Sequence, residues 1–118
     1  DILNLIEEIE SLGKREKQEL RNRLGILIGH LLKWEYQSGK RSNSWKATIR
    51  EQRRRIKEHL QENHSLISYL LEVVISAYQD GVDLAIQETD LPDTTFPSEN
   101  PYSISQILDP AFLVNQGE

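Results

Sequence analysis

The stretch REKQELRNRLGILIGHLLKWEY, residues 15–36, decides the fold class of this chain. Its leucines recur every three or four residues, the spacing that places side chains on one face of an α-helix. Further apolar residues widen this face until little of the helix remains polar, which is typical of a central helix. The two sets are Leu20, Leu24, Leu27 and Leu31, and then Ile26, Ile28, Leu32 and Trp34. Gly25 and Gly29, four residues apart, predict close approach of a neighbouring backbone.

Amphipathic patterns on both sides of this stretch predict further helices. One covers residues 2–12 and ends at Gly13, a typical C-terminal stop. Another begins after a cap at one of residues 42–44 and reaches residue 63. The next is capped by Ser65 and continues to residue 88. No stretch has the alternating pattern of a β-strand.

The C-terminal part of the chain differs in composition, since all four prolines lie between residues 92 and 110. Within it, Ser103 and Gln106 have the spacing of a capping box ahead of a short helix that ends at residue 108. A chain of 118 residues is the size of one domain. We therefore expect an all-α fold, a helical bundle of four main helices with a short C-terminal helix. It forms a single domain over residues 1–118, with the Pro-containing segment 92–118 packed on it.

Charge is strongly segregated along the sequence. Residues 1–13 carry four acidic residues and no base. Residues 14–57 hold all fourteen Lys and Arg against four acids, a net charge of +10, and residues 58–118 carry eleven acids and no Lys or Arg. Such segregation indicates either a basic surface for nucleic acid or a fold whose basic middle faces its acidic ends.

A basic stripe runs along the helix expected over residues 43–63. At 100 degrees per residue, Lys46, Arg50, Arg53 and Lys57 lie within about 60 degrees of one another, and Arg54 flanks them. Like charges at this spacing each cost a few tenths of a kcal/mol, roughly, so the stripe needs counterions. Phosphate could supply them, as could Glu7 and Glu10 of the first helix or the C-terminal acids. A solvated or internally neutralised face is the more common outcome for a charge run.

Polar residues among apolar ones suggest a second candidate site. His30 and Trp34 lie one helical turn apart, and Trp45 could return to them after the turn, together with Ser42. With Glu7 and Glu10 they would line a cleft for a small polar ligand or for acid–base chemistry. A hydrogen-bonded network that fixes helix register is the alternative that we favour, because no diagnostic spacing supports catalysis.

Several chemistries lack their motifs. There is no cysteine, which removes disulfides, thiolate metal sites and cysteine nucleophiles. No histidine has an acid three residues before it, and HExxH, nucleophile-elbow and phosphate-loop patterns are absent. No apolar run reaches the roughly 20 residues that span a bilayer. We therefore predict no catalytic residue, metal or cofactor, no membrane partner and a cytoplasmic location, with an enzyme the less favoured class.

Five strings occur in one order along most of the chain: NLIEEIESLG from residue 4, LIGHLLKWEYQ from residue 27, RSNSWKATIREQRRRI from residue 41, ETDLP from residue 88 and FPSENPYSISQILD from residue 96. They resemble the domain-of-unknown-function family 29, a family of uncharacterised bacterial proteins. The resemblance implies an α-helical bundle and supplies no activity. Asp90 stands where the family more often has glycine, and Asn100 where it often has cysteine.

The helices expected over residues 15–36 and 65–88 carry more apolar surface than three short partners can cover. Either the chain dimerises or a segment that normally packs there precedes it, and the sequence starts after the aromatic and acidic segment that usually opens the resembled family. We expect a non-enzymatic interaction module with a protein partner or a second copy. A nucleic-acid-binding accessory that uses the basic stripe is the alternative, and a small-ligand or hydrolytic site near Glu7, His30 and Trp45 is the weakest.

Overall fold

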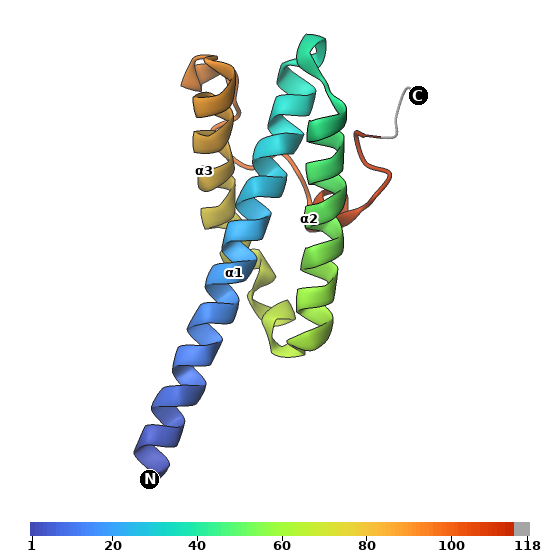
Figure 1. Ribbon diagram of the computed structural model, residues 1–118. Helices are drawn as coiled ribbons and strands as arrows, with labels where there is room; N and C mark the ends of the chain where they lie inside the picture. The colour runs from blue at the N-terminus through green and yellow to red at the C-terminus, as the bar shows by residue number, and fades with distance from the viewer. Residues whose placement is uncertain (115–118) are drawn as a thin grey trace.

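The computed structural model describes residues 1–114, except for the side chains of residues 9, 11 and 12. It has four α-helices in these residues: α1 (Ile2–Tyr36), α2 (Asn43–Glu62), α3 (Leu70–Thr89) and α4 (Ile104–Leu108). Three short 3₁₀ turns join them: η1 (Ser38–Lys40), η2 (His64–Tyr69) and η3 (Asp93–Thr95). No strand occurs in this part of the chain, so the all-α class is confirmed. Figure 1 shows α1 between α2 and α3.

The expected stop at Gly13 is wrong, because α1 continues through it as one helix of 35 residues. Glycine in a helix costs about 1 kcal/mol relative to alanine, which the strong helix formers Leu12 and Lys14 on either side outweigh. The bundle therefore has three long helices and a short one instead of four and a short one. At 1.5 Å per residue α1 is about 52 Å long, which accounts for most of the 58 Å longest extent.

The centre of the bundle is the stretch that decides the fold. Six leucines and isoleucines of α1 are at most 2 % exposed: Leu20, Leu24, Leu27, Ile28, Leu31 and Leu32. The predicted close approach at Gly25 and Gly29 is confirmed. A Cβ atom at Gly29 would lie 3.1 Å from the backbone oxygen of Gly81 in α3, and one at Gly81 would lie 2.9 Å from the backbone nitrogen of Gly29. Glycine thus lets α1 and α3 touch backbone to backbone.

Helix ends follow local chemistry in part. The Ser42 side chain caps α2 by accepting from the Trp45 amide, and Ser103 and Gln106 form the predicted capping box at α4. Ser65 does not start α3, since residues 64–69 form the tighter turn η2 and the helix begins at Leu70. At the end of α3, Asp90 has a left-handed φ of 60°. That conformation favours glycine, the residue more common there in the resembled family.

The segment after α3 returns across the bundle and adds apolar side chains to the same core. Phe96, Tyr102, Ile107 and Val114 are all buried in it. The Tyr78 hydroxyl donates to the Pro97 carbonyl, and the Tyr102 hydroxyl donates to Glu35 at 2.7 Å. Asn100 accepts from the Tyr102 amide, a local turn bond. Residues 115–118 of the predicted C-terminal segment lie outside the described residues.

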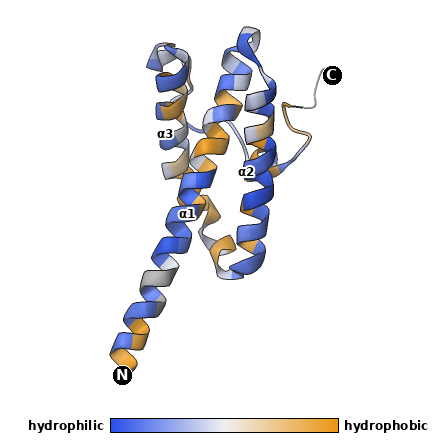
Figure 2. Cartoon of the chain, viewed as in Figure 1, coloured by the Kyte–Doolittle hydropathy of each residue, from blue (hydrophilic) through white to orange (hydrophobic). Residues whose placement is uncertain are grey.

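Three regions leave large apolar side chains exposed, one of them η2, where Ile67 is 53 % exposed. Ile2, Leu3, Leu5 and Ile6 lie on the first turns of α1, which project beyond the bundle (Figures 1 and 2). Leu71 and Ile75 lie on α3 and are 75 % and 68 % exposed. The expected surplus thus occurs on α3, whereas residues 20–32 of α1 are covered. We call residues 1–13 the acidic arm. None of the described helices is long and apolar enough to cross a membrane.

Candidate functional site

A groove of about 830 Å³ lies between α2, the turn η2 and the segment that follows α4. All members of the basic stripe line it: Lys46, Arg50, Arg53, Arg54 and Lys57. They come from successive turns of α2 because the intervals of three and four residues repeat the helical period. The sequence therefore found one wall of the groove. No acidic residue occurs among the described residues that line it, so this wall is positively charged.

The remaining lining is largely apolar. It comes from α2 itself, from η2 and from the C-terminal segment, and consists of Ile49, Leu60, Ile67, Leu108, Pro110 and Val114. Ile67 is 53 % exposed and so offers contact area to a ligand. Leu108, Pro110 and Val114 lie more than 40 residues beyond the end of α2, so no local pattern in the sequence predicts the groove. An apolar floor beside cationic side chains suits a ligand that is both apolar and anionic.

Arg53 departs from the interpretation of the stripe as a phosphate-facing surface. Arg53 is only 6 % exposed. Its guanidinium donates to four backbone carbonyls in α4 and the turn after it: Ile107 at 2.8 Å, Phe112 at 3.2 Å, and Gln106 and Pro110 at 3.4 Å. Burial lowers the pKa of Arg53. Its donors are used to hold α4 and the following turn against α2. Arg53 thus lines the groove, but its guanidinium donors are already occupied by these carbonyls.

Three other bases of the stripe remain at the surface. Arg50 and Lys57 are exposed, and Arg54 is exposed with its Nε 3.9 Å from Glu58 on the next helical turn. Lys46 is half-buried. Neither Glu7 nor Glu10 forms a described ion pair with this stripe. The positive charge of the groove is thus carried by Arg50, Arg54 and Lys57, with Lys46 at one end.

The residues of the predicted polar cleft do not meet at one place. Glu7 and Glu10 are exposed on the acidic arm, whereas His30 lies near the other end of the same helix. Glu7 and His30 are 23 residues apart in α1, so about 35 Å separates them along its axis. A site that combines a carboxylate of the arm with His30 and Trp45 in one molecule is excluded by this rigid spacing.

The other residues of that set lie near the end of α1 and the start of α2, where Lys33 and Arg41 contact two of them. Lys33 is buried, donates to Glu88 at 2.6 Å and lies 4.5 Å from the Trp45 ring centroid. The Arg41 guanidinium lies over the Trp34 ring and donates to the Trp34 carbonyl, while Ser42 caps α2. These contacts tie the end of α1 to α2 and α3. Trp34 Nε1 has no partner among the described residues.

His30 belongs to the same region and serves the helix. Its Nδ1 lies 2.8 Å from the Ile26 carbonyl, so that nitrogen carries the proton and donates. Burial lowers the pKa of His30, because the charged imidazolium loses water contacts. His30 is therefore neutral at neutral pH.

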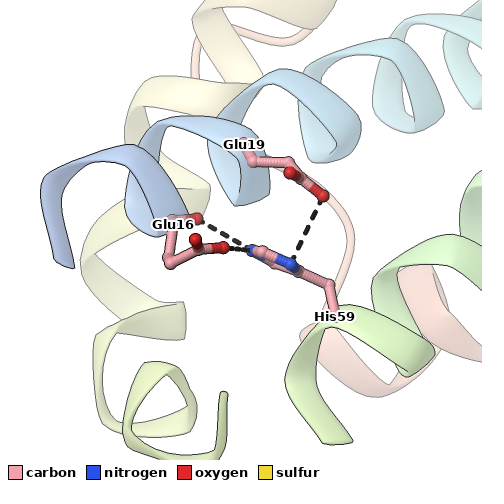
Figure 3. Close-up of side chains that lie close together, drawn as sticks. All are labelled: Glu16, Glu19 and His59. Carbon is pink, nitrogen blue, oxygen red and sulfur yellow. Dashed lines mark hydrogen bonds and ion pairs between the residues drawn. The ribbon is translucent and has the colours of Figure 1, made fainter. Parts of the chain in front are cut away.

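A cluster of Glu16, Glu19 and His59 joins α1 to α2, and it has no counterpart in the sequence predictions (Figure 3). His59 is buried. Its Nε2 donates to the Glu16 carbonyl at 3.0 Å and lies 3.4 Å from the Glu16 carboxylate, while its Nδ1 is 3.3 Å from Glu19. The two carboxylates thus address opposite edges of the ring, and Glu19 also pairs with Arg23 at 3.1 Å. This arrangement clamps the imidazole between two helices. One ligand atom from each of the three residues also lies within 4.8 Å of the other two, the spacing of a group that could hold a metal ion.

Only two of the three residues of this cluster could have been grouped from sequence. Glu16 and Glu19 are three residues apart and so share a helix face, but His59 is 40 or more residues away. Taken with the polar network, the cluster leaves the basic and apolar groove as the candidate site, because its exposed bases are not used to hold helices together.

Comparisons with known proteins bear on the family and not on the activity. The family model described as a domain of unknown function, DUF29, matches residues 1–113 of the chain. The resemblance stated from the five strings is thereby confirmed. A search of curated proteins and a search of solved structures each found no match.

Proposed function

The chain belongs to the family described as a domain of unknown function, DUF29, and from its own groove we propose that it is a protein-interaction module that binds an acidic amphipathic segment. The observation that carries the proposal is the pairing of a basic wall with an apolar wall in one groove of about 830 Å³. The module acts by binding and not by catalysis.

The size and chemistry of the groove suit a helical or extended peptide. The wall from Lys46 to Gln61 covers 16 residues of α2, whose 15 helical steps span about 22 Å. Along this length Arg50, Arg54 and Lys57 offer three successive cationic turns. A ligand with an apolar stripe and flanking carboxylates would bury the stripe on Leu108 and Val114 and leave its charges against these bases. Peptide helices bind grooves in this way, with apolar anchors at helical spacing.

Nucleic acid is the alternative ligand and fits the groove less well. Half of the lining is apolar and offers no donor to phosphate oxygens. Arg53, central in the stripe, is already committed to backbone carbonyls, and Arg54 lies close to Glu58. Phosphate binding rests on several free cations acting together. The groove therefore favours a ligand that uses both of its walls.

The direct test is fluorescence anisotropy with a labelled, designed helical peptide that has one leucine face flanked by glutamates. We expect saturable binding to the wild-type chain at dilution, and weaker binding as salt rises. Changing Arg50 and Arg54 together to glutamate should weaken it about tenfold or more, because rim charges of the wrong sign repel the peptide. A peptide with lysines in place of the glutamates should not bind.

The chain supplies a matched control. Arg54 and Arg55 are adjacent and exposed, and each lies within 4 Å of Glu58, at 3.9 and 3.8 Å. Only Arg54 lines the groove. Arg54→Glu should weaken peptide binding while Arg55→Glu leaves it unchanged. Equal effects of the two changes, or no binding of the peptide at all, contradict the proposal. Steeply salt-dependent binding of an unlabelled DNA duplex in its place would support the nucleic-acid alternative.

A further inference from the structure

The acidic arm has the properties of the ligand that the groove fits. On a helical wheel Ile2, Leu5 and Ile6 lie within about 100 degrees of one another. Glu7, Glu8 and Glu10 lie outside this arc, which gives an apolar face flanked by carboxylates. All described side chains of the arm are exposed, and Ile2 and Leu3 are 75 % and 69 % exposed. Such an apolar face on a soluble helix marks a contact with another surface.

Length and charge match those of the groove. The 13 residues of the arm span about 20 Å, and the α2 wall of the groove spans about 22 Å. The arm carries four acids and no base, whereas the described lining of the groove carries bases and no acid. The two surfaces are complementary in both of their chemical components.

The arm cannot enter the groove of its own chain. Glu16, just past the arm, contacts His59 near the C-terminal end of α2, so the arm leaves the bundle at that end. Because α1 is one continuous helix, the arm then continues away from α2 (Figure 1). A second molecule is needed to bring an arm and a groove together.

We infer that the groove of one copy binds the acidic arm of a second copy, an inference that rests on the proposed function. Ile2, Leu5 and Ile6 of the arm pack on the apolar wall formed by Ile67, Leu108 and Val114. Glu7, Glu8 and Glu10 face Arg50, Arg54 and Lys57. The contact covers the apolar arm and brings acids to the exposed bases of the groove at the same time.

A charge-swap experiment tests the pairing. Glu7→Lys with Glu10→Lys reverses the arm, and Arg50→Glu with Arg54→Glu reverses the groove. All four positions are exposed, so both variants should fold, which circular dichroism checks. By sedimentation velocity the wild-type chain should self-associate, and each variant should do so at least about tenfold more weakly. An equimolar mixture of the two variants should regain association, because every arm then meets a groove of opposite charge.

Crosslinking locates the contact, since the chain has no cysteine of its own. Chains with Ile6→Cys are mixed with chains carrying either Leu108→Cys, half-buried in the groove, or Ile75→Cys, which lies on α3 outside the groove and is more exposed. A short bis-maleimide should join Ile6→Cys to Leu108→Cys and much less to Ile75→Cys. Preferential joining to Ile75→Cys would overturn the inference, and so would failure of the charge-swapped mixture to associate.

The failure of this inference is distinguishable from failure of the proposed function. A chain that stays monomeric at every concentration but binds the designed acidic peptide in its groove keeps the proposed function and loses the second-copy inference. A chain that neither self-associates nor binds the peptide loses both.

Discussion

The two ends of helix α1 share one continuous backbone and have opposite surroundings. Residues 20–36 lie between α2 and α3, and leucines such as Leu20 and Leu27 are 0 % exposed. In residues 1–13, the described leucines and isoleucines, of the same size, are exposed, with Leu3 at 69 %. The apolar pattern of the sequence is helical in both regions. Periodicity therefore identifies an amphipathic helix, while the presence of a partner decides whether its apolar face is a core or a binding surface.

Charged residues repeat this difference. In the covered half, Arg21 forms two hydrogen bonds to Asp80, at 2.8 and 3.0 Å, and buried Lys33 pairs with Glu88. Arg21 and Lys33 thus each meet an acid of α3, while Arg23 of the same half pairs with Glu19 on the preceding turn of α1. The acids Glu7, Glu8 and Glu10 of the arm form no described ion pair. Charged residues of the covered half hold the helices of the bundle together. The acids of the arm remain exposed and can pair with the bases of a second copy.

The largest expected effect is on the free energy of unfolding, when a leucine is changed to alanine in each half of α1. Leu27→Ala removes a fully buried side chain from the core and should lower the free energy of unfolding by about 2–5 kcal/mol. Leu5→Ala, on the arm, should change it by less than about 0.5 kcal/mol at dilution, because Leu5 is already exposed. Urea unfolding followed by circular dichroism measures both.

A second readout completes this pair of variants. At high concentration Leu5→Ala should weaken self-association, while at dilution it leaves folding intact. If Leu5→Ala instead destabilised the dilute chain as much as Leu27→Ala, the arm would be part of the core and the contrast between the two halves would be lost.

The next effect contrasts two bases of the stripe on α2. Arg53→Gln leaves the carbonyls of Gln106, Ile107 and Phe112 without their charged donor in a buried place. It should lower the free energy of unfolding by about 2–4 kcal/mol. Arg50→Gln should leave stability within about 0.5 kcal/mol and reduce acidic-peptide binding. Thermal unfolding and anisotropy on the two variants provide the check. Equal stabilities would show that Arg53 is not the clamp of the C-terminal segment.

Much of the fold follows from local patterns in the sequence. The central stripe from Leu20 to Leu32, the cap at Ser42 and the capping box at Ser103 are all interactions between residues close in sequence. For the same reason Gly13 was misleading: a glycine stop is a local tendency worth about 1 kcal/mol, and neighbouring helix formers outweigh it. The turn over residues 64–69 depends on how α2 and α3 pack, so a helix start at Ser65 could not be rejected from sequence.

The candidate site divides in the same way. Its basic wall lies on one helix and was predicted in full, residue by residue. The roles of those bases were not, because Arg53 binds carbonyls more than 50 residues away while Arg50 remains exposed. The apolar wall contains Leu108 and Val114, which reach the groove only after the chain has crossed the bundle. Helical spacing cannot predict such contacts between distant segments. The predicted polar cleft is not formed for a different reason, because Glu7 and His30 lie 23 residues apart on one continuous helix.

The smallest expected effect compares a glycine packed against the covered half of α1 with a glycine of the arm, and the two substitutions should change stability with opposite sign. Gly81→Ala places a Cβ atom 2.9 Å from the Gly29 backbone nitrogen, so α1 and α3 must separate slightly. We expect a loss of about 1–2 kcal/mol in the free energy of unfolding, after the gain in helix propensity. Gly13→Ala meets nothing within 4 Å and should raise helicity and stabilise the helix by about 0.5–1 kcal/mol. Circular dichroism and urea unfolding measure both changes. If Gly13→Ala destabilised the chain, a neighbouring surface would have to lie against the arm at Gly13. If that surface belongs to a second copy, the destabilisation should disappear on dilution.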